Sequence, residues 1–129
     1  MKKDNKGFSL VELIIVIAIM AVLIGILAPT YMRFVQRSKV STDITNAQEM
    51  ATAINTAITD GVTIGGINNG TATAANTTVT GLPGFTTMPA SKVNATYSWV
   101  VSWDTTDGVT SITLGGDQIY PDPTDYHTT

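Results

Sequence analysis

The chain is poor in several residue types, and each shortage excludes a class of function. It has 129 residues and no cysteine, which excludes disulfides, thiol catalysis and cysteine metal sites. Its single histidine, His127, lies almost at the C-terminus, so a histidine-based nucleophile relay or a zinc site lacks its partners. We therefore expect no enzymatic activity and no cofactor.

Basic residues are scarce beyond position 39, where only Lys92 remains. The acidic residues of that part are Asp43, Glu49, Asp60, Asp104, Asp107, Asp117, Asp122 and Asp125. Such a surface repels phosphates, so no direct nucleic acid binding is expected. These carboxylates either keep a threonine-rich surface soluble or, for Asp117, Asp122 and Asp125, gather as weak candidates around a calcium ion.

One long apolar run dominates the N-terminal third. No charge occurs from Leu13 to Met32, about 20 residues, which is enough to cross a bilayer as a helix. Glu12 lies at the start of the run, and a carboxylate deep in lipid costs roughly 2.5–3.5 kcal/mol. A simple membrane anchor gains nothing from that cost, so Glu12 indicates a function.

The residues before the run do not form an ordinary secretory signal. Such a signal has an apolar core of about 7–15 residues closed by small residues, whereas this run is longer and has no such closure before Pro29. The lysines of the leader favour a cytoplasmic N-terminus by the positive-inside rule. Three basic residues on the far side of the run weaken that argument: Arg33, Arg37 and Lys39.

The stretch Gly7-Phe8-Ser9-Leu10-Val11-Glu12 resembles the class III signal of type IV pilins and pseudopilins. The resemblance covers the leader and the first helix, about a third of the chain. It implies that a prepilin peptidase cuts between Gly7 and Phe8, that Phe8 is N-methylated, and that an assembly platform in the membrane builds the subunits into a homopolymer. Pro29 matches a proline that many pilins carry.

The resemblance implies that the whole protein is a structural subunit of a type IV pilus-like surface filament. The alternative is a pseudopilin of a type II secretion or DNA-uptake machine. Before assembly the subunit would be a single-pass membrane protein, and afterwards part of an extracellular filament. Many pilins close their C-terminal region with a disulfide, and the lack of cysteine favours a Gram-positive bacterial source.

We expect assembly to depend on three positions, Glu12, Gly25 and Pro29. Glu12 is predicted to pair with the Phe8 amine of a neighbouring subunit, because an unpaired charge inside an apolar bundle is costly. Pro29 removes a backbone hydrogen bond, nominally the one to Gly25, and glycine adds flexibility. The segment between them is either a tolerated kink or a stretch that extends on assembly.

The predicted fold class is α+β, a long N-terminal helix packed on a small antiparallel meander of about three strands. An apolar stripe, Ile44, Ala47, Ala51, Ile54 and Ile58, recurs at helical spacing, and Asp60-Gly61 ends the helix. A first strand is expected from Val93 to Trp103, with Val93, Ala95, Tyr97, Trp99, Val101 and Trp103 facing the helix. A hairpin at Asp104–Gly108 leads to an alternating strand at 109–114, and a short strand covers 118–120.

The expected organisation has five parts. They are a leader at 1–7, an apolar helix at 8–32, an amphipathic continuation at 33–60, a Gly/Thr/Asn-rich loop region at 61–92, and a sheet with a tail at 93–129. The loop region is expected to be a long surface excursion with one short strand at Thr77–Thr80.

Overall fold

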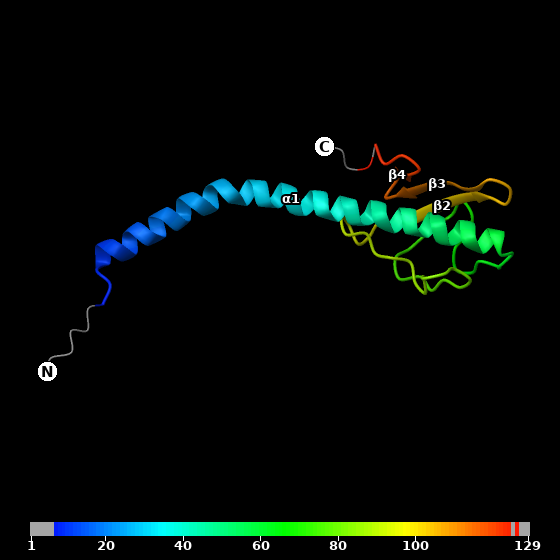
Figure 1. Ribbon diagram of the computed structural model, residues 1–129, viewed down its shortest axis with the longest axis horizontal. Helices are drawn as coiled ribbons and strands as arrows, with labels where there is room; N and C mark the ends of the chain where they lie inside the picture. Colours follow the sequence, from blue (N-terminus) through cyan, green and yellow to red (C-terminus); the bar gives the residue numbers. More distant parts are fainter. Residues whose placement is uncertain (1–6, 125, 127–129) are drawn as a thin grey trace. The chain divides into compact units, whose positions relative to one another are not determined.

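The computed structural model describes residues 7–124 and Tyr126. Most of the leader and two residues of interest, Asp125 and His127, lie outside the described residues. The chain divides into two compact units, Met1–Val35 and Gln36–Thr129, which are treated separately below. One helix, α1, runs from Leu10 to Thr59 and contributes to both units (Figure 1), as the sequence predicts.

The C-terminal end of α1 confirms the predicted stop. Gly61 has a φ of 67°, the left-handed conformation that glycine adopts without strain. The Gly61 N–H donates to the Ile58 carbonyl at 3.1 Å, and the Val62 N–H donates to the Ala57 carbonyl at 2.9 Å. These two bonds form a Schellman motif, which satisfies carbonyls that the last helical turn leaves free.

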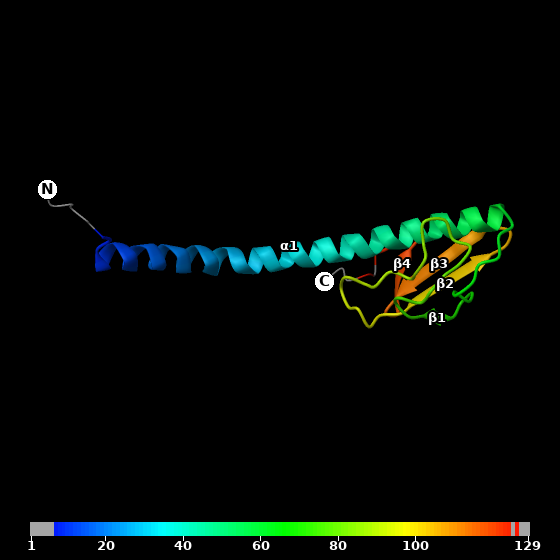
Figure 2. The same ribbon diagram turned by 90° about the horizontal axis from the view of Figure 1, so that it is seen from below.

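The sheet has four antiparallel strands in the order β1 (Ala72–Thr73), β2 (Trp99–Asp104), β3 (Gly108–Leu114) and β4 (Asp117–Tyr120). They form a meander, as expected, with one strand more than the three predicted (Figure 2). The additional strand, β1, lies in the 61–92 region. The short strand expected at Thr77–Thr80 is wrong, because only isolated bridges, Gly65 to Thr80 and Thr78 to Thr87, occur there.

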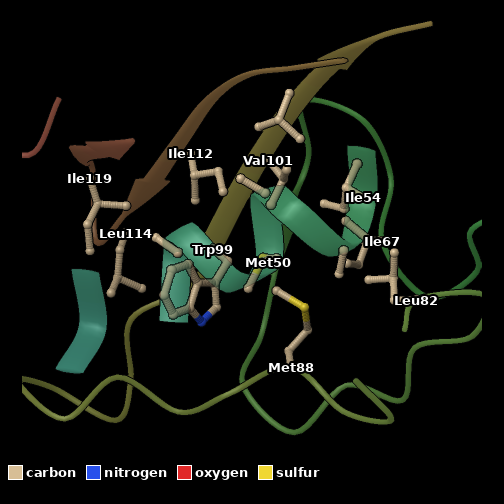
Figure 3. Packing of buried hydrophobic residues seen from close by; sticks show 14 of the residues in the cluster. Met50, Ile54, Ile67, Leu82, Met88, Trp99, Val101, Ile112, Leu114 and Ile119 are labelled. Atoms are coloured by element: carbon tan, nitrogen blue, oxygen red, sulfur yellow. The ribbon is translucent and has the colours of Figure 1, made fainter. Parts of the chain in front are cut away.

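The core lies between the second half of α1 and the sheet. Ala47, Ala51 and Ile54 are buried, and Ile44 and Ile58 pack against them half-buried, which confirms the predicted apolar stripe. Figure 3 shows side chains of α1 facing those of β2, β3 and β4. The strand and tail residues of this core are Trp99, Val101, Val109, Ile112, Leu114, Ile119 and Tyr126.

Most residues of the 61–92 region are exposed, as its composition predicts, but the region also supplies residues to the core. Its buried apolar residues are Ile67, Val79, Leu82 and Met88. Figure 3 places Met88 and Leu82 beside the helix side chains Met50 and Ile54. A four-stranded sheet and one helix leave part of the core uncovered, and these loop residues complete it.

The expected strand from Val93 begins six residues late, at Trp99. Side chains bind the backbone donors that a strand would use for pairing. The Ser91 hydroxyl accepts from the N–H groups of Val93 and Asn94, at 3.2 and 3.1 Å, and the Asn94 side chain accepts from the Thr96 N–H at 3.0 Å. Such local bonds compete with a ladder and hold the chain in turns, so the predicted start of the strand at Val93 is wrong. Of the side chains predicted to face the helix, only Ala95 is exposed, whereas the others are buried or packed against the core.

A bulge interrupts the alternation predicted along β3, which holds from Ser111 to Leu114. Ser102 pairs with Ser111 and Trp103 pairs with Val109, which leaves Thr110 as an extra residue. An added residue reverses which face the later side chains occupy. Val109 and Ile112 are therefore both buried although an odd number of positions separates them.

Candidate functional site

The predicted processing junction is open to solvent in the first unit. Residues 7–9 precede α1 and have no regular structure. Phe8 is 92% exposed, and no heavy atom lies within 4 Å of the position that a Cβ on Gly7 would take. Nothing in the described part of the chain therefore blocks access to the Gly7–Phe8 peptide bond.

Ser9 and Glu12 form a capping box at the start of α1. The Ser9 hydroxyl accepts from the Glu12 N–H at 3.2 Å, and Glu12 Oε2 accepts from the Ser9 N–H at 3.3 Å. Two N–H groups that the first turn leaves free are thus satisfied reciprocally. The carboxylate also lies at the positive end of the helix dipole.

This capping box corrects the expectation that a plain anchor gains nothing from Glu12. A helix cap contributes about 0.5–2 kcal/mol, so Glu12 has a local structural role whether or not the chain assembles. The sequence carries the signal for this cap as Ser-x-x-Glu before an apolar run, a role of Glu12 that its cost in lipid does not indicate.

The helix that follows exposes an apolar surface on every side. From Leu10 to Phe34 every large apolar side chain is exposed. The most apolar 18-residue window of α1 has a mean hydropathy of 3.1, and none of it is buried. Length and composition suit a membrane span, and a surface of this kind requires either lipid or other helices around it.

Gly25 and Pro29 lie inside α1, which stays helical through both. Nothing lies within 4 Å of the position that a Cβ on Gly25 would take. Pro29 cannot donate to the carbonyl four residues earlier, so one hydrogen bond of the helix is missing there. The isolated subunit thus corresponds to the helical state of this segment, while an extended state remains a prediction.

Two acidic residues of the second unit, Asp104 and Asp122, accept backbone hydrogen bonds within turns. Asp122 accepts from the Thr124 N–H at 3.1 Å, and Asp104 accepts from the Thr106 N–H at 2.7 Å. The bonds from the Thr106 backbone and hydroxyl lower the pKa of Asp104. Asp117 is exposed at the start of β4.

The weak calcium prediction gains no support. No three histidine, cysteine, aspartate or glutamate side chains come together within residues 7–124 and Tyr126. The third candidate, Asp125, lies outside the described residues, so the calcium site stays an untested prediction.

Comparison with known proteins concerns the same N-terminal region. Residues 2–28 match the family model described as the prokaryotic N-terminal methylation motif. The type IV major fimbrial protein FimA of Dichelobacter nodosus is 44% identical over 61 residues, which are 47% of this chain and 39% of FimA. The N-terminal region of this chain is therefore similar to that of type IV pilins.

Two further pilin relatives match over similar lengths. A fimbrial protein of Pseudomonas aeruginosa is 37% identical over 59 residues, 46% of this chain and 38% of the relative. The type IV major pilin protein PilA of Myxococcus xanthus is 45% identical over 49 residues, 38% of this chain and 22% of PilA. The matched segments thus span less than half of these relatives, and no solved structure matches.

The comparisons bear on two expectations from the sequence, the pseudopilin alternative and the Gram-positive source. The relatives carry fimbrial and pilin names, so the pseudopilin alternative is not favoured. The expectation of a Gram-positive source finds no support in these matches. The family model ends at residue 28, so it does not reach the second unit, which begins at Gln36.

Proposed function

We propose that this chain is a structural, non-enzymatic subunit of a type IV pilus-like surface filament. One observation carries the proposal. A helix with apolar side chains exposed on all sides begins directly after an open Gly7–Phe8 bond, with Glu12 in its first turn. Such a surface is stable first in lipid and then among identical helices, so one element serves as membrane anchor and as polymer core.

Processing is the first step of the proposed function. A prepilin peptidase cuts between Gly7 and Phe8 and removes the leader, and N-methylation of the new Phe8 amine follows. The exposure of this junction supports access by such an enzyme. The assembly platform in the membrane then transfers the subunit to the growing filament.

Glu12 acts in assembly through its charge. Cleavage creates an amine on Phe8, and methylation to a secondary amine leaves it basic. Among packed apolar helices an unpaired carboxylate is expensive, and removing one partner of a buried pair typically costs roughly 3–5 kcal/mol. Pairing between Glu12 and the Phe8 amine of a neighbour sets the axial register, because a slipped neighbour buries both charges alone.

The segment from Gly25 to Pro29 extends when the subunit moves from membrane to filament. It already lacks one hydrogen bond at Pro29 and has no close side-chain contact at Gly25. A cryo-EM map of the filament tests this step: extended backbone between these residues is expected, and continuous α-helix there contradicts it.

Substitution of Glu12 by glutamine tests the charge separately from the cap. A capping box accepts glutamine as well as glutamate at this position, so Glu12→Gln keeps the helix start and removes only the charge. We expect normal insertion and cleavage, and a sharp loss of filaments. Ser9→Ala, which removes the cap and keeps the charge, and Glu49→Gln, at an exposed site on α1, are the matched controls.

The measurements are filament yield and the mass of the surface protein. Immunogold labelling with an antibody to residues 61–129 is expected to mark long fibres, whereas label confined to the envelope favours the pseudopilin alternative. Mass spectrometry is expected to find a methylated Phe8 as the first residue. Filament yield of Glu12→Gln cells equal to wild type refutes the role of the charge, and an intact leader refutes the processing step.

A further inference from the structure

Asp43 is a fully buried acidic residue in the second unit, with 0% exposure on α1. Its Oδ2 accepts from the Ser91 hydroxyl at 2.6 Å and its Oδ1 from the Lys92 N–H at 2.7 Å. The Val93 N–H donates to Oδ2 at 3.3 Å. The fourth donor is the Tyr126 hydroxyl, which reaches Oδ2 at 2.7 Å.

These contacts join three segments that are far apart in sequence. Asp43 and Tyr126 are 83 positions apart, and Asp43 and Ser91 are 48. All four donors are neutral hydroxyl or backbone N–H groups, so hydrogen bonds alone stabilise the buried charge. A carboxylate held in this way fixes the position of every donor around it.

Tyr126 is the donor to Asp43 that lies nearest the C-terminus in the sequence. Its side chain is 1% exposed, and it follows β4 after an irregular segment at 121–124. In both views the red C-terminal segment lies beside the cyan part of α1 (Figures 1 and 2). Besides the Asp43 contact, the Tyr126 N–H donates to the Pro123 carbonyl at 3.1 Å, which is a local turn bond.

We propose that Tyr126 is a latch, in which its hydroxyl closes on buried Asp43 and holds this residue to α1 without a covalent crosslink. The proposal is independent of filament assembly. Asp43 keeps three donors when the Tyr126 hydroxyl is removed, so the latch opens while the rest of the unit stays folded. The chain has no cysteine. The hydrogen bond between Tyr126 and Asp43 therefore stabilises a part of the chain that no disulfide can crosslink.

The raised pKa of Tyr126 agrees with a closed latch, in which the hydroxyl is buried and protonated. Burial raises the pKa of Tyr126 above its ordinary value, and the bond to Asp43 raises it further. Tyr97 adds a smaller effect in the same direction, while Ser91 opposes it. Because the pKa of Tyr126 is raised in the folded state, the contribution of this bond to stability is fully present below about pH 10, the ordinary pKa of tyrosine, and is lost as the pH rises through the higher folded-state pKa.

Hydrogen exchange of the full chain in detergent micelles tests the latch. In Tyr126→Phe we expect the amide of residue 126 to exchange roughly 10- to 100-fold faster, since a hydrogen bond to a charged group contributes that much to an opening equilibrium. Exchange in β2 and β3 is expected to rise less than exchange at residue 126. Tyr120→Phe, at a half-buried tyrosine of β4, is the matched control.

Two results overturn the proposal. The first is exchange at residue 126 of Tyr126→Phe within about twofold of wild type, and the second is an equal rise in β2 and β3, which indicates general destabilisation. A spectrophotometric titration gives an independent readout. The difference between wild type and Tyr126→Phe should show one phenol that ionises above about pH 10, and ionisation at or below that value contradicts the latch.

Discussion

Replacement of Asp43 by asparagine removes the charge from the centre of the second unit and keeps the shape of the side chain. In its best orientation the amide oxygen faces the Lys92 N–H, where Oδ1 now accepts at 2.7 Å. The amide nitrogen then takes the position of Oδ2 and points hydrogens toward groups that donate in the wild type. The opposite orientation leaves the Lys92 N–H facing another donor and is worse.

The magnitude follows from the donors that lose their acceptor. The Ser91 oxygen already accepts from Val93 and Asn94, so its hydroxyl cannot simply reverse to accept from the new amide. One buried donor without a partner costs about 1–3 kcal/mol, and loss of the charge-assisted bond from Tyr126 adds about 1–2 kcal/mol. Relief of the buried charge offsets part of this, which leaves a destabilisation of about 2–4 kcal/mol.

Thermal unfolding of the full chain in detergent micelles measures this change, with near-UV circular dichroism of the buried Trp99 as the signal. For a domain of this size each kcal/mol lowers the Tm by roughly 4–8 °C, so Asp43→Asn is expected to melt about 8–30 °C below wild type. Asp117→Asn, at an exposed position, should stay within about 0.5 kcal/mol. A Tm of Asp43→Asn within about 2 °C of wild type refutes the assignment of Asp43 as a central acceptor.

Three further predictions concern the sheet and can be checked by the same melting experiment. Gly108→Ala should lose more than about 1 kcal/mol, because Gly108 has a φ of 80° and an added Cβ meets the Asn55 side chain; an unchanged Tm contradicts that strain. Deletion of Thr110 should lower stability by about 1–3 kcal/mol, since without the bulge Val109 moves out of the core; retained stability means that the bulge is dispensable. Trp99→Phe should cost about 2–3 kcal/mol, because the indole N–H loses a 2.7 Å bond to a loop carbonyl and the smaller ring leaves a void; a loss below about 1 kcal/mol counts against it.

Features that depend on neighbouring residues could be predicted from the sequence alone. The apolar run and the helix stop at Gly61 each rest on consecutive residues whose preferences agree. The apolar stripe of α1 is likewise visible as a period, and the structure buries its central members. The capping box at Ser9 was equally readable, because its two partners are three positions apart.

Only the tertiary structure decided the features that depend on distant partners. Thr110 becomes a bulge because Val109 and Ile112 must share one face against α1, and that demand comes from packing and not from strand propensity. The 61–92 region looks like a surface loop by composition, yet it supplies core residues because a small sheet leaves apolar surface to cover.

The contacts of Asp43 show the same limit most clearly. In the sequence it is one acidic residue among several on a polar part of the chain, and nothing nearby marks it as buried. Asp43 acts as a central acceptor because the hydroxyl groups of Ser91 and Tyr126, 48 and 83 positions away in the sequence, lie beside it in the fold. Local chemistry therefore determined the N-terminal helix and its ends, whereas long-range burial and hydrogen bonding decided how the second unit closes.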